Sequence, residues 1–435
     1  MNQETFTQTL YNSRLPKEYK MNNGEQIDVL GNSILNYSIF NKYGSTSSYW
    51  SMGDKEITEY NNLLLNSKMA LFNVITGYDS RTIMNTLNSV KYMIIRDPYY
   101  KKIPYGYKLE KNIINKKTGL EEKIYKNRYC LNPAYTYDSF ITKKQWMKLS
   151  AIDKEDSMIE TAIVDKKNNF VKEKKKVVLN DKKIQSGIDL LERIKKYNKN
   201  VIINNDSITI KKAKSYVRFP VEGEPKTENY ICFKNFSYAP LDNEKAEDET
   251  PIVFWYNDKG NYCNYATKYS RYTTDKKDLL VNLGYSKMNG KIITIDFRKK
   301  GRYKFTDIQF ISKKLNRYDK NVKKLKDNSV KKIKVNGNNI YLQKKSKKAE
   351  ILCINIPYSN GWTAYVNGKK VNTERVNVMK LGIILKKGNN NIILKYQTPG
   401  MKLGLMISIF TILILVFRMI IICKKQKLMS INNNH

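Results

Sequence analysis

Residues that could act in catalysis are scarce in this chain of 435 residues. One histidine is present, His435, and it ends a polar tail. A Ser-His-Asp triad, a Cys-His dyad and a histidine-containing zinc site each need an imidazole held inside the fold. The sequence therefore argues against these reaction classes, and we predict no metal site and no cofactor.

Five cysteines are spread widely along the sequence, and no two of them form a CxxC pair. This spacing does not support a zinc ribbon or a thioredoxin motif. We expect cysteines that are buried as apolar side chains, and the spacing assigns no disulfide. The five are Cys130, Cys232, Cys263, Cys353 and Cys423.

Carboxylates offer the remaining enzymatic route, since a pair of Asp or Glu residues can serve glycosidic chemistry. Asp79 and Asp97 flank a predicted helix–strand unit, and Asp138 follows Tyr137. Asp79 is equally well explained as the N-cap of the helix after it, and Asp97 as a turn residue before Pro98. We assign no catalytic residue and interpret Asp79 as structural.

Tyrosines beside small polar residues suggest a sugar-binding surface. Carbohydrate sites often combine an aromatic platform with a carboxylate or amide that binds the hydroxyl groups. For any single tyrosine, packing in a core or rim with the hydroxyl left in water is the more frequent role. The candidate contacts to a glycan or polymer are Tyr99, Tyr100, Tyr105, Tyr107, Tyr137 and Asp138.

The chain carries 79 Lys and Arg residues against 40 Asp and Glu residues, a formal net charge of +39. Such a self-repelling surface favours an anionic partner: an anionic lipid, a polyanionic envelope polymer or a nucleic acid. Compositional bias is the alternative, because Lys, Asn, Ile and Tyr are all abundant. No zinc finger, RNP motif, basic zipper or homeodomain is present in the sequence, so we expect no nucleic-acid partner.

The elements that would position these residues predict an α+β fold. Residues 1–165 are expected to form a mixed α/β lobe. Apolar periodicity predicts one helix over 81–90 and a second over 152–164, with Asp153 as the N-cap of the second.

Beyond this lobe the pattern changes to strands. Residues 166–214 read as a lysine-rich connector that carries one amphipathic helix near 188–197. Residues 215–330 contain many short apolar runs separated by Gly and Asn, which predicts a β-sandwich. Residues 331–400 either continue this sandwich or form a second, small β domain.

The clearest hairpin signal is the pair Asn367-Gly368. Asn-Gly favours a two-residue turn, and Gly368 supplies a positive φ at low cost. In the strand before the turn, alternation places Trp362, Ala364 and Val366 on one face. We therefore interpret Trp362 and Gly368 as structural residues.

Residues 403–423 predict a single transmembrane helix, followed by a basic and polar tail over 424–435. Nearly every position in this segment is apolar, and Arg418 lies near its end, where a long side chain can reach the interface. The first residues show no apolar signal-peptide region, and lysines flank both ends of the span. A chain with this helix alone would keep its large domain in the cytoplasm.

Seven segments occur in a characteristic order. They are GYDSRTIMNTLNSVKY at 77–92, IPYGY at 103–107, AYTYDSFI at 134–141, KLSAIDKEDSMIETAIV at 148–164, LVNLGYS at 280–286, PYSNGWTAYVNGKK at 357–370 and YQTPGMKLG at 396–404. Together they resemble the extracytoplasmic half of the YfhO family of bacterial multi-pass membrane proteins. The resemblance covers most of the chain from about residue 40 to the membrane helix.

The resemblance implies a GT-C-like glycosyltransferase architecture, which uses an undecaprenyl-phosphate-linked sugar to decorate envelope polymers such as lipoteichoic acid. The family's many-helix half, with its acidic catalytic loop, has no counterpart in this sequence, so no catalytic residue is carried over. The implied location is the cell membrane, with the large domain extracytoplasmic when upstream helices are present. The implied partners are the cytoplasmic membrane, an anionic envelope polymer or lipid, and a multi-pass half encoded upstream.

We expect an accessory or truncated part of such a machine, without enzyme activity of its own. One alternative is a self-sufficient hydrolase or transferase that uses carboxylates and tyrosines of residues 40–140. The other is a structural or sensing cell-surface domain, or a gene remnant, with no activity. Two acidic groups facing one cleft would favour the enzyme, whereas strongly salt-dependent polymer binding would favour the accessory role.

Overall fold

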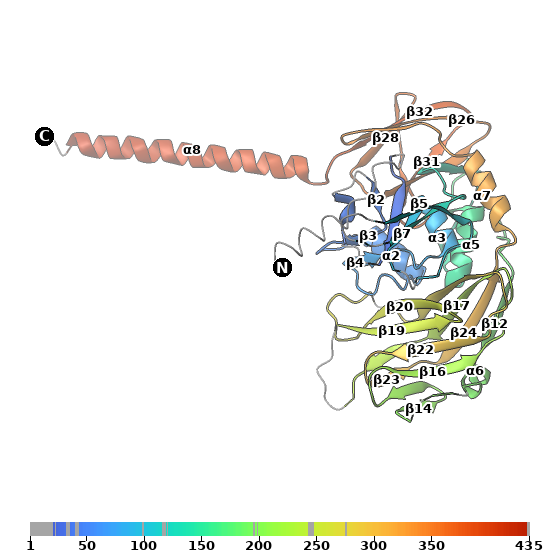
Figure 1. Ribbon diagram of the computed structural model, residues 1–435. Helices are drawn as coiled ribbons and strands as arrows, with labels where there is room; N and C mark the ends of the chain where they lie inside the picture. Colours follow the sequence, from blue (N-terminus) through green and yellow to red (C-terminus); the bar gives the residue numbers. More distant parts are fainter. Residues whose placement is uncertain are drawn as a thin grey trace.

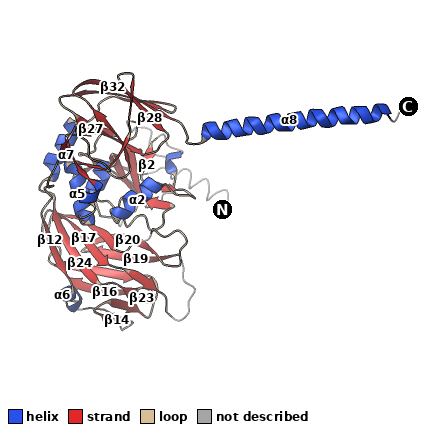
Figure 2. Cartoon of the chain, turned by 180° about the vertical axis from the view of Figure 1, so that it is seen from behind, coloured by secondary structure: helices blue, strands red, loops and turns tan. Residues whose placement is uncertain are grey.

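Three lobes lie in a row in the computed structural model, and one long helix leaves them sideways (Figures 1 and 2). An N-terminal lobe lies between a middle β-sandwich and a C-terminal β-sheet. The structure describes residues 21, 23–31, 35–39, 43–97, 100–114, 119, 121–194, 196–197, 199–241, 248–274 and 276–432. Tyr99 and His435, named above, lie outside the described residues.

A mixed five-stranded sheet and short helices build the N-terminal lobe. Its elements are β1 (Gln26–Leu30), η1 (Tyr37–Ile39), β2 (Gly44–Ser45), β3 (Ser47–Tyr49), α2 (Lys55–Leu63), β4 (Val74–Thr76), α3 (Thr82–Leu87), β5 (Val90–Ile95), β6 (Tyr107–Ile114), β7 (Glu121–Asn127), α4 (Lys143–Trp146) and α5 (Ala151–Glu160). The strand order is β2-β1-β5-β7-β6, while β3 and β4 form a separate pair. β1 runs parallel to β5, and β5 runs antiparallel to β7.

A seven-stranded sheet combines strands from both ends of the soluble region. Its strands are β8 (Ala134–Tyr137), β9 (Ser139–Thr142), β10 (Ala162–Val164), β11 (Lys172–Glu173), β27 (Glu350–Pro357), β30 (Glu374–Val376) and β31 (Lys380–Leu385). The order is β11-β9-β10-β30-β31-β27-β8. One sheet therefore crosses the predicted boundary between the first lobe and residues 331–400.

The middle lobe is a sandwich with an apolar core between its sheets. Its elements are β12 (Lys182–Ser186), α6 (Ile188–Glu192), β13 (Lys196–Tyr197), β14 (Val201–Asn204), β15 (Ser207–Ile210), β16 (Ser215–Pro220), β17 (Thr227–Lys234), β18 (Ser237–Ala239), β19 (Glu249–Tyr256), β20 (Lys259–Ala266), β21 (Leu279–Ser286), β22 (Ile292–Phe297), β23 (Gly301–Lys304) and β24 (Asp307–Lys314). The sheet β12-β24-β17-β21 faces the sheet β13-β16-β22-β19-β20, and β14-β15-β23-β18 forms a third sheet. The predicted connector thus contributes β12 to β15 to this lobe.

The C-terminal sheet packs on β27 and β31 through a third apolar cluster. Its strands are β25 (Ile333–Asn336), β26 (Asn339–Ser346), β28 (Trp362–Val366), β29 (Lys369–Val371) and β32 (Gly388–Tyr396), in the order β25-β26-β32-β28-β29. β28 and β29 form the predicted hairpin, with positive φ at Asn367 (50°) and Gly368 (79°). Trp362 is half-buried, and its ring centroid lies 4.9 Å from that of Tyr396.

Two further helices complete the fold. α7 (Tyr318–Asp327) packs on the N-terminal lobe, and α8 (Met401–Asn432) is the helix that leaves the body. The 24 residues Met401–Lys424 are predominantly apolar and all exposed. At 1.5 Å per residue they extend about 36 Å, enough to cross a bilayer core of about 30 Å. The α+β class with a C-terminal apolar helix is confirmed.

Local signals placed some boundaries wrongly. Asp79 is not the N-cap of α3, because Arg81 occupies that position and Asp79 itself has a φ of 53°. Asp153 is not the N-cap of α5, since the side-chain oxygen of Ser150 accepts the backbone N–H of Asp153. The helix ends at Glu160, and the rest of the predicted helix forms β10.

The sandwich and the N-terminal lobe are joined through a buried charge network. Glu155 of α5 lies 3.3 Å from the Arg81 guanidinium and 3.0 Å from the Lys313 ammonium of β24. Lys313 also pairs with Asp156 at 3.1 Å, and the Tyr230 hydroxyl of β17 donates to Glu155 at 3.2 Å. Burial opposes ionisation, but Arg81 and Lys313 outweigh it and hold the pKa of Glu155 below its ordinary value.

We expect Glu155→Gln to lower the free energy of unfolding by about 3–5 kcal/mol, because it leaves Arg81 and Lys313 buried with one anion fewer. Urea unfolding of the detergent-solubilised chain, followed by tryptophan fluorescence, measures the change. Lys101→Ala is the matched control, since it removes an exposed pair with Asp258 and should cost under about 1 kcal/mol. Equal losses in both variants would contradict the prediction.

Lys380 is a buried lysine whose hydrogen bonds go to neutral groups. Its ammonium nitrogen donates to the Leu87 carbonyl at the end of α3 and lies 3.2 Å from the Tyr135 hydroxyl. Its exposed fraction is 1%. Burial disfavours the charged form and lowers the pKa of Lys380 to about 8.

This pKa makes the stability of the fold depend on pH. Between about pH 8 and 10.4 the folded chain has released the Lys380 proton, whereas the unfolded chain still holds it. The free energy of unfolding should therefore rise with pH in this window by up to about 1.4 kcal/mol per pH unit, relative to Lys380→Met. Urea unfolding of both proteins from pH 7.5 to 10 tests this, and parallel profiles would exclude it.

Candidate functional site

A cleft of about 590 Å³ lies between the N-terminal lobe and the middle sandwich. Lys101 and residues 103–108 and 128–129 line it from the N-terminal lobe. Residues 257–259, in the turn between β19 and β20, and 285–288, at the end of β21, line it from the sandwich. We call this space the tyrosine cleft.

Half-buried phenol rings form one wall of the tyrosine cleft. The rings of Tyr105 and Tyr129 stack with centroids 5.7 Å apart and an angle of 19°. Tyr285 from β21 lies 5.1 Å from Tyr105, and Tyr318 of α7 supports both N-terminal rings edge-on. These rings come from three separate parts of the chain, so the wall exists only after folding.

The phenols of the cleft are neutral hydrogen-bonding groups. The Tyr105 hydroxyl donates to Asp319 Oδ2 at 3.1 Å, at the start of α7. Burial raises the pKa of Tyr105, Tyr129 and Tyr285 above the ordinary value. They therefore offer ring faces and hydroxyls to a ligand rather than negative charge.

Basic side chains surround the rings. The cleft is lined by five cationic side chains and one carboxylate: Lys101, Lys108, Arg128, Lys259, Lys287 and Asp258. Asp258 pairs with Lys101 at 3.0 Å, and the half-buried Lys259 donates to the Tyr285 carbonyl at 2.5 Å. Burial lowers the pKa of Lys259. Lys108, Arg128 and Lys287 are exposed, so the cleft favours an anionic ligand.

The described lining of the cleft contains a single carboxylate and so offers no pair of carboxylates for glycosidic chemistry. Asp258 is its one carboxylate, and that group is bound to Lys101. Within the described residues, no three His, Cys, Asp or Glu side chains come together to hold a metal ion. Chemically, this arrangement can stack on sugar rings and hold anions.

The structure brings two of the six predicted contact residues to this cleft, Tyr105 and Tyr107. Tyr107 is largely buried, and its hydroxyl donates to the Val90 carbonyl at 3.3 Å. Tyr100 is half-buried in the N-terminal lobe and does not line the cleft, and its hydroxyl is hydrogen-bonded to Ser80 Oγ. The third member of this stretch, Tyr99, is among the residues not described.

Tyr137 and Asp138 lie elsewhere. Tyr137 is buried in the N-terminal core, and its hydroxyl donates to the Met158 carbonyl at 2.5 Å. Asp138 accepts from Lys324 at 2.8 Å and from Lys348 at 3.0 Å. Burial opposes ionisation, but these two hydrogen bonds outweigh it and lower the pKa of Asp138 to about 2.

Asp79 is enclosed where the two lobes meet. Its carboxylate pairs with Lys102 at 2.7 Å and accepts the Asn282 backbone N–H at 2.7 Å and the Asn261 side-chain amide at 2.8 Å. Burial alone would raise its pKa, but Lys102 and the hydrogen bonds keep the pKa of Asp79 below its ordinary value. Because every one of these partners is buried, Asp79 has no access to a ligand in this structure.

Sequence reasoning missed Tyr129 and Tyr285. Tyr129 follows β7, which was not predicted, and Tyr285 lies near the end of a sandwich strand 156 positions further along. No local pattern connects them with Tyr105.

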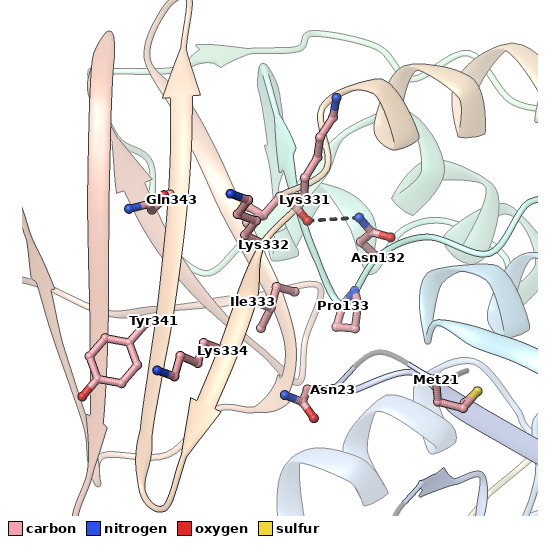
Figure 3. A pocket seen from close by; sticks show the side chains of 11 residues that line it. Met21, Asn23, Asn132, Pro133, Lys331, Lys332, Ile333, Lys334, Tyr341 and Gln343 are labelled. Atoms are coloured by element: carbon pink, nitrogen blue, oxygen red, sulfur yellow. Dashed lines mark hydrogen bonds between the residues drawn. The ribbon is translucent and has the colours of Figure 1, made fainter. Parts of the chain in front are cut away.

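A second space, of about 520 Å³, lies between the N-terminal lobe and the C-terminal sheet (Figure 3). Figure 3 shows Lys332 and Lys334 beside Tyr341 and Gln343 of β26, with Asn23 on the other side. These lysines are exposed, and Tyr341 is 37% exposed. This lysine groove is smaller and less aromatic than the tyrosine cleft.

The fold and the cleft define a strand-rich, membrane-associated protein with a basic, aromatic cleft between two lobes. The family model for bacterial membrane protein YfhO matches residues 2–408, and the chain belongs to this family. An uncharacterized protein YfhO from Bacillus subtilis (strain 168) is 23% identical over 404 residues, which are 90% of this chain and 42% of that protein. The chain thus spans less than half the length of this curated relative.

Likeness to solved structures is weak. The C-terminal CBM6 of LamC, a marine laminarinase from Zobellia galactanivorans, is 11% identical with a TM-score of 0.21, covering 29% of this chain and 98% of that one. The arabinofuranosyltransferase AftD from Mycobacteria is 8% identical with a TM-score of 0.14, covering 70% of this chain and 26% of that one. At these scores neither likeness carries information about function.

We expect Gly106→Ala to disturb the cleft wall. Gly106 has a φ of 83°, and a Cβ there would come within 2.3 Å of the Tyr129 ring. Gly368→Ala is the matched control, because Gly368 has a φ of 79° and nothing within 4 Å of its Cβ position. Both changes carry the backbone cost of about 1 kcal/mol, but Gly106→Ala should cost at least about 1 kcal/mol more. Urea unfolding of both variants measures this, and equal losses would show that the Tyr129 ring yields freely.

Proposed function

We propose that this chain is the membrane-anchored, extracytoplasmic part of an envelope glycosylation machine, and that the tyrosine cleft holds a sugar-bearing anionic polymer such as lipoteichoic acid. The observation that carries the proposal is the cleft itself. Tyr105, Tyr129 and Tyr285 present neutral aromatic faces, and exposed cations flank them. This combination of rings and cations suits a ligand that carries both sugars and phosphates.

The phenol rings and the cations of the cleft would bind different parts of the polymer. Apolar faces of a sugar ring pack against phenols, while its hydroxyls exchange hydrogen bonds with water and with phenol oxygens. Lys108, Arg128 and Lys287 would pair with phosphates, each contact being weak because solvent and salt screen it. The rings would therefore determine which sugars fit the cleft, and the cations would attract the phosphates of the polymer.

The chain would act as an accessory rather than as the catalyst. Family resemblance implies that the acidic catalytic loop and the lipid-linked sugar belong to a multi-pass half, supplied by upstream sequence or another chain. The cleft's one carboxylate, Asp258, is paired with Lys101, which agrees with this division of labour. In this proposal α8 spans the membrane and keeps the bound polymer near that active site.

A structural or sensing domain is the second candidate. The buried network around Glu155 and the enclosed Asp79 favour it, because they fix the two lobes relative to each other without serving any ligand. A rigid spacer would need such a joint and would not need an occupied cleft. Polymer binding separates the two candidates.

We expect Tyr105→Ala to weaken binding of lipoteichoic acid to the full chain about tenfold, the loss that one aromatic contact of about 1.4 kcal/mol implies. Isothermal titration in detergent at physiological salt measures this. Tyr341→Ala in the lysine groove is the matched control, since it removes an exposed tyrosine from another basic surface and should change affinity less than twofold. Lys287→Glu, at an exposed position, should also weaken binding without touching the packed rings.

The dependence of the affinity on salt concentration can contradict the proposal. Stacking persists at high salt because it is not mainly coulombic, so part of the affinity should remain after a several-fold increase in salt. If affinity instead falls by orders of magnitude and Tyr105→Ala binds like the unaltered chain, dispersed lysines hold the polymer and the cleft is not the site. If no binding is measured at any salt concentration, the structural candidate stands.

A further inference from the structure

A group of apolar side chains stands exposed on the N-terminal lobe around β3. Ile39 is 76% exposed, Tyr49 45%, Trp50 62% and Met52 91%. The two segments that carry them are fixed together, because Asn36 accepts the Tyr49 backbone N–H at 2.9 Å and donates to the Tyr49 carbonyl at 3.0 Å. Apolar residues exposed singly are common on protein surfaces, but these four lie together on two segments that are held side by side.

The middle sandwich adds more rings to the same surface. The ring of Phe72, just before β4, lies 5.7 Å from that of Tyr272 between centroids. The Phe72 backbone N–H donates to the Tyr272 carbonyl at 2.9 Å. Tyr272 is 41% exposed and Tyr269 is 49% exposed. The Lys268 ammonium lies 5.1 Å from the Tyr269 ring centroid. We call this set, with the exposed Arg271, the aromatic rim.

The aromatic rim lies on the side of the body from which α8 leaves. Figure 1 places β3 and β4 toward α8 and places α5 and α7 on the far side, and Figure 2 shows α2 and α7 in the same relation. The link to α8 is short: Gln397 still donates to the Gly361 carbonyl at 3.0 Å, and α8 begins at Met401. The three residues between them can span only about 10 Å.

We propose that the aromatic rim docks on the bilayer surface, with Trp50 and Met52 at the boundary between headgroups and acyl chains. Aromatic rings are the side chains that favour this boundary, and Lys268 and Arg271 would meet anionic headgroups beside them. The proposal depends on α8 crossing the membrane and is independent of the function of the tyrosine cleft.

Helix α7, on the opposite side of the body, has the contrary composition. The exposed side chains of α7 are all charged: Asp319, Lys320, Lys323, Lys324, Lys326 and Asp327. Because α8 leaves across the row of lobes, docking of the rim would lay the three lobes along the membrane instead of upright on it (Figure 1). The tyrosine cleft adjoins the start of α7 through the Tyr105–Asp319 hydrogen bond, so it would stay away from the lipid.

Photo-crosslinking of the full chain tests the proposal. The photoreactive residue benzoylphenylalanine replaces Trp50 in one variant and Tyr269 in another, in nanodiscs of phosphatidylglycerol and phosphatidylethanolamine. Met288 and Lys323 are the matched control positions: Met288 is 75% exposed and apolar but lines the tyrosine cleft, and Lys323 is exposed on α7. Mass spectrometry identifies lipid adducts, and thermal melting confirms that each variant is folded.

We expect lipid adducts at position 50 and at position 269, at least tenfold above those at 288 and 323. Adducts at 269 alone would still support docking if the variant at 50 fails to fold. Equal lipid yields at all four positions would overturn the proposal, because they would reflect non-specific collision. Adducts to a second copy of the chain in place of lipid, or no adduct at either rim position in folded variants, would also overturn it.

Discussion

Four carboxylates and three cations are buried together where the N-terminal lobe meets the middle sandwich. They are Asp79, Glu155, Asp156, Glu228, Arg81, Lys102 and Lys313. Burying any one of these charges alone would cost several kcal/mol. Arg81 pairs with Glu155 and Lys102 pairs with Asp79 inside the N-terminal lobe, while Lys313 of the sandwich pairs across the joint with Glu155 and Asp156. The lobes therefore cannot move far apart without exposing the whole network, and the geometry between them is fixed.

The tyrosine cleft depends on this fixed joint. Its wall of rings needs Tyr105 and Tyr129 from one lobe and Tyr285 from the other, at centroid distances of 5.1 Å and 5.7 Å. Lys102, which holds Asp79 at the joint, lies between the exposed Lys101 and the cleft-lining loop. A change that loosened the charge network would thus reach the cleft without altering any residue that lines it.

A different junction, between the C-terminal sheet and the seven-stranded sheet, bears on the orientation of the body. Because the C-terminal sheet shares the seven-stranded sheet's core and continues into α8 after a short link, α8 has a defined direction relative to the N-terminal lobe. The tyrosine cleft and the aromatic rim then occupy different sides. A polymer-binding side facing away from lipid and an apolar side facing it would suit a domain held flat on a membrane, which is the arrangement proposed for this member of the YfhO family.

Local chemistry was readable from the sequence. Asn367-Gly368 specified its hairpin because two adjacent residues with positive φ suffice for that turn, and the apolar run at 403–423 specified a helix because no polar face remained. Pairing between distant segments was not readable, because alternation fixes which face a residue occupies but not which strand lies beside it. The sequence predicted Asp79 as a helix N-cap, and only the tertiary structure showed it buried in a pair with Lys102. Likewise, only the tertiary structure placed Tyr285 next to Tyr105.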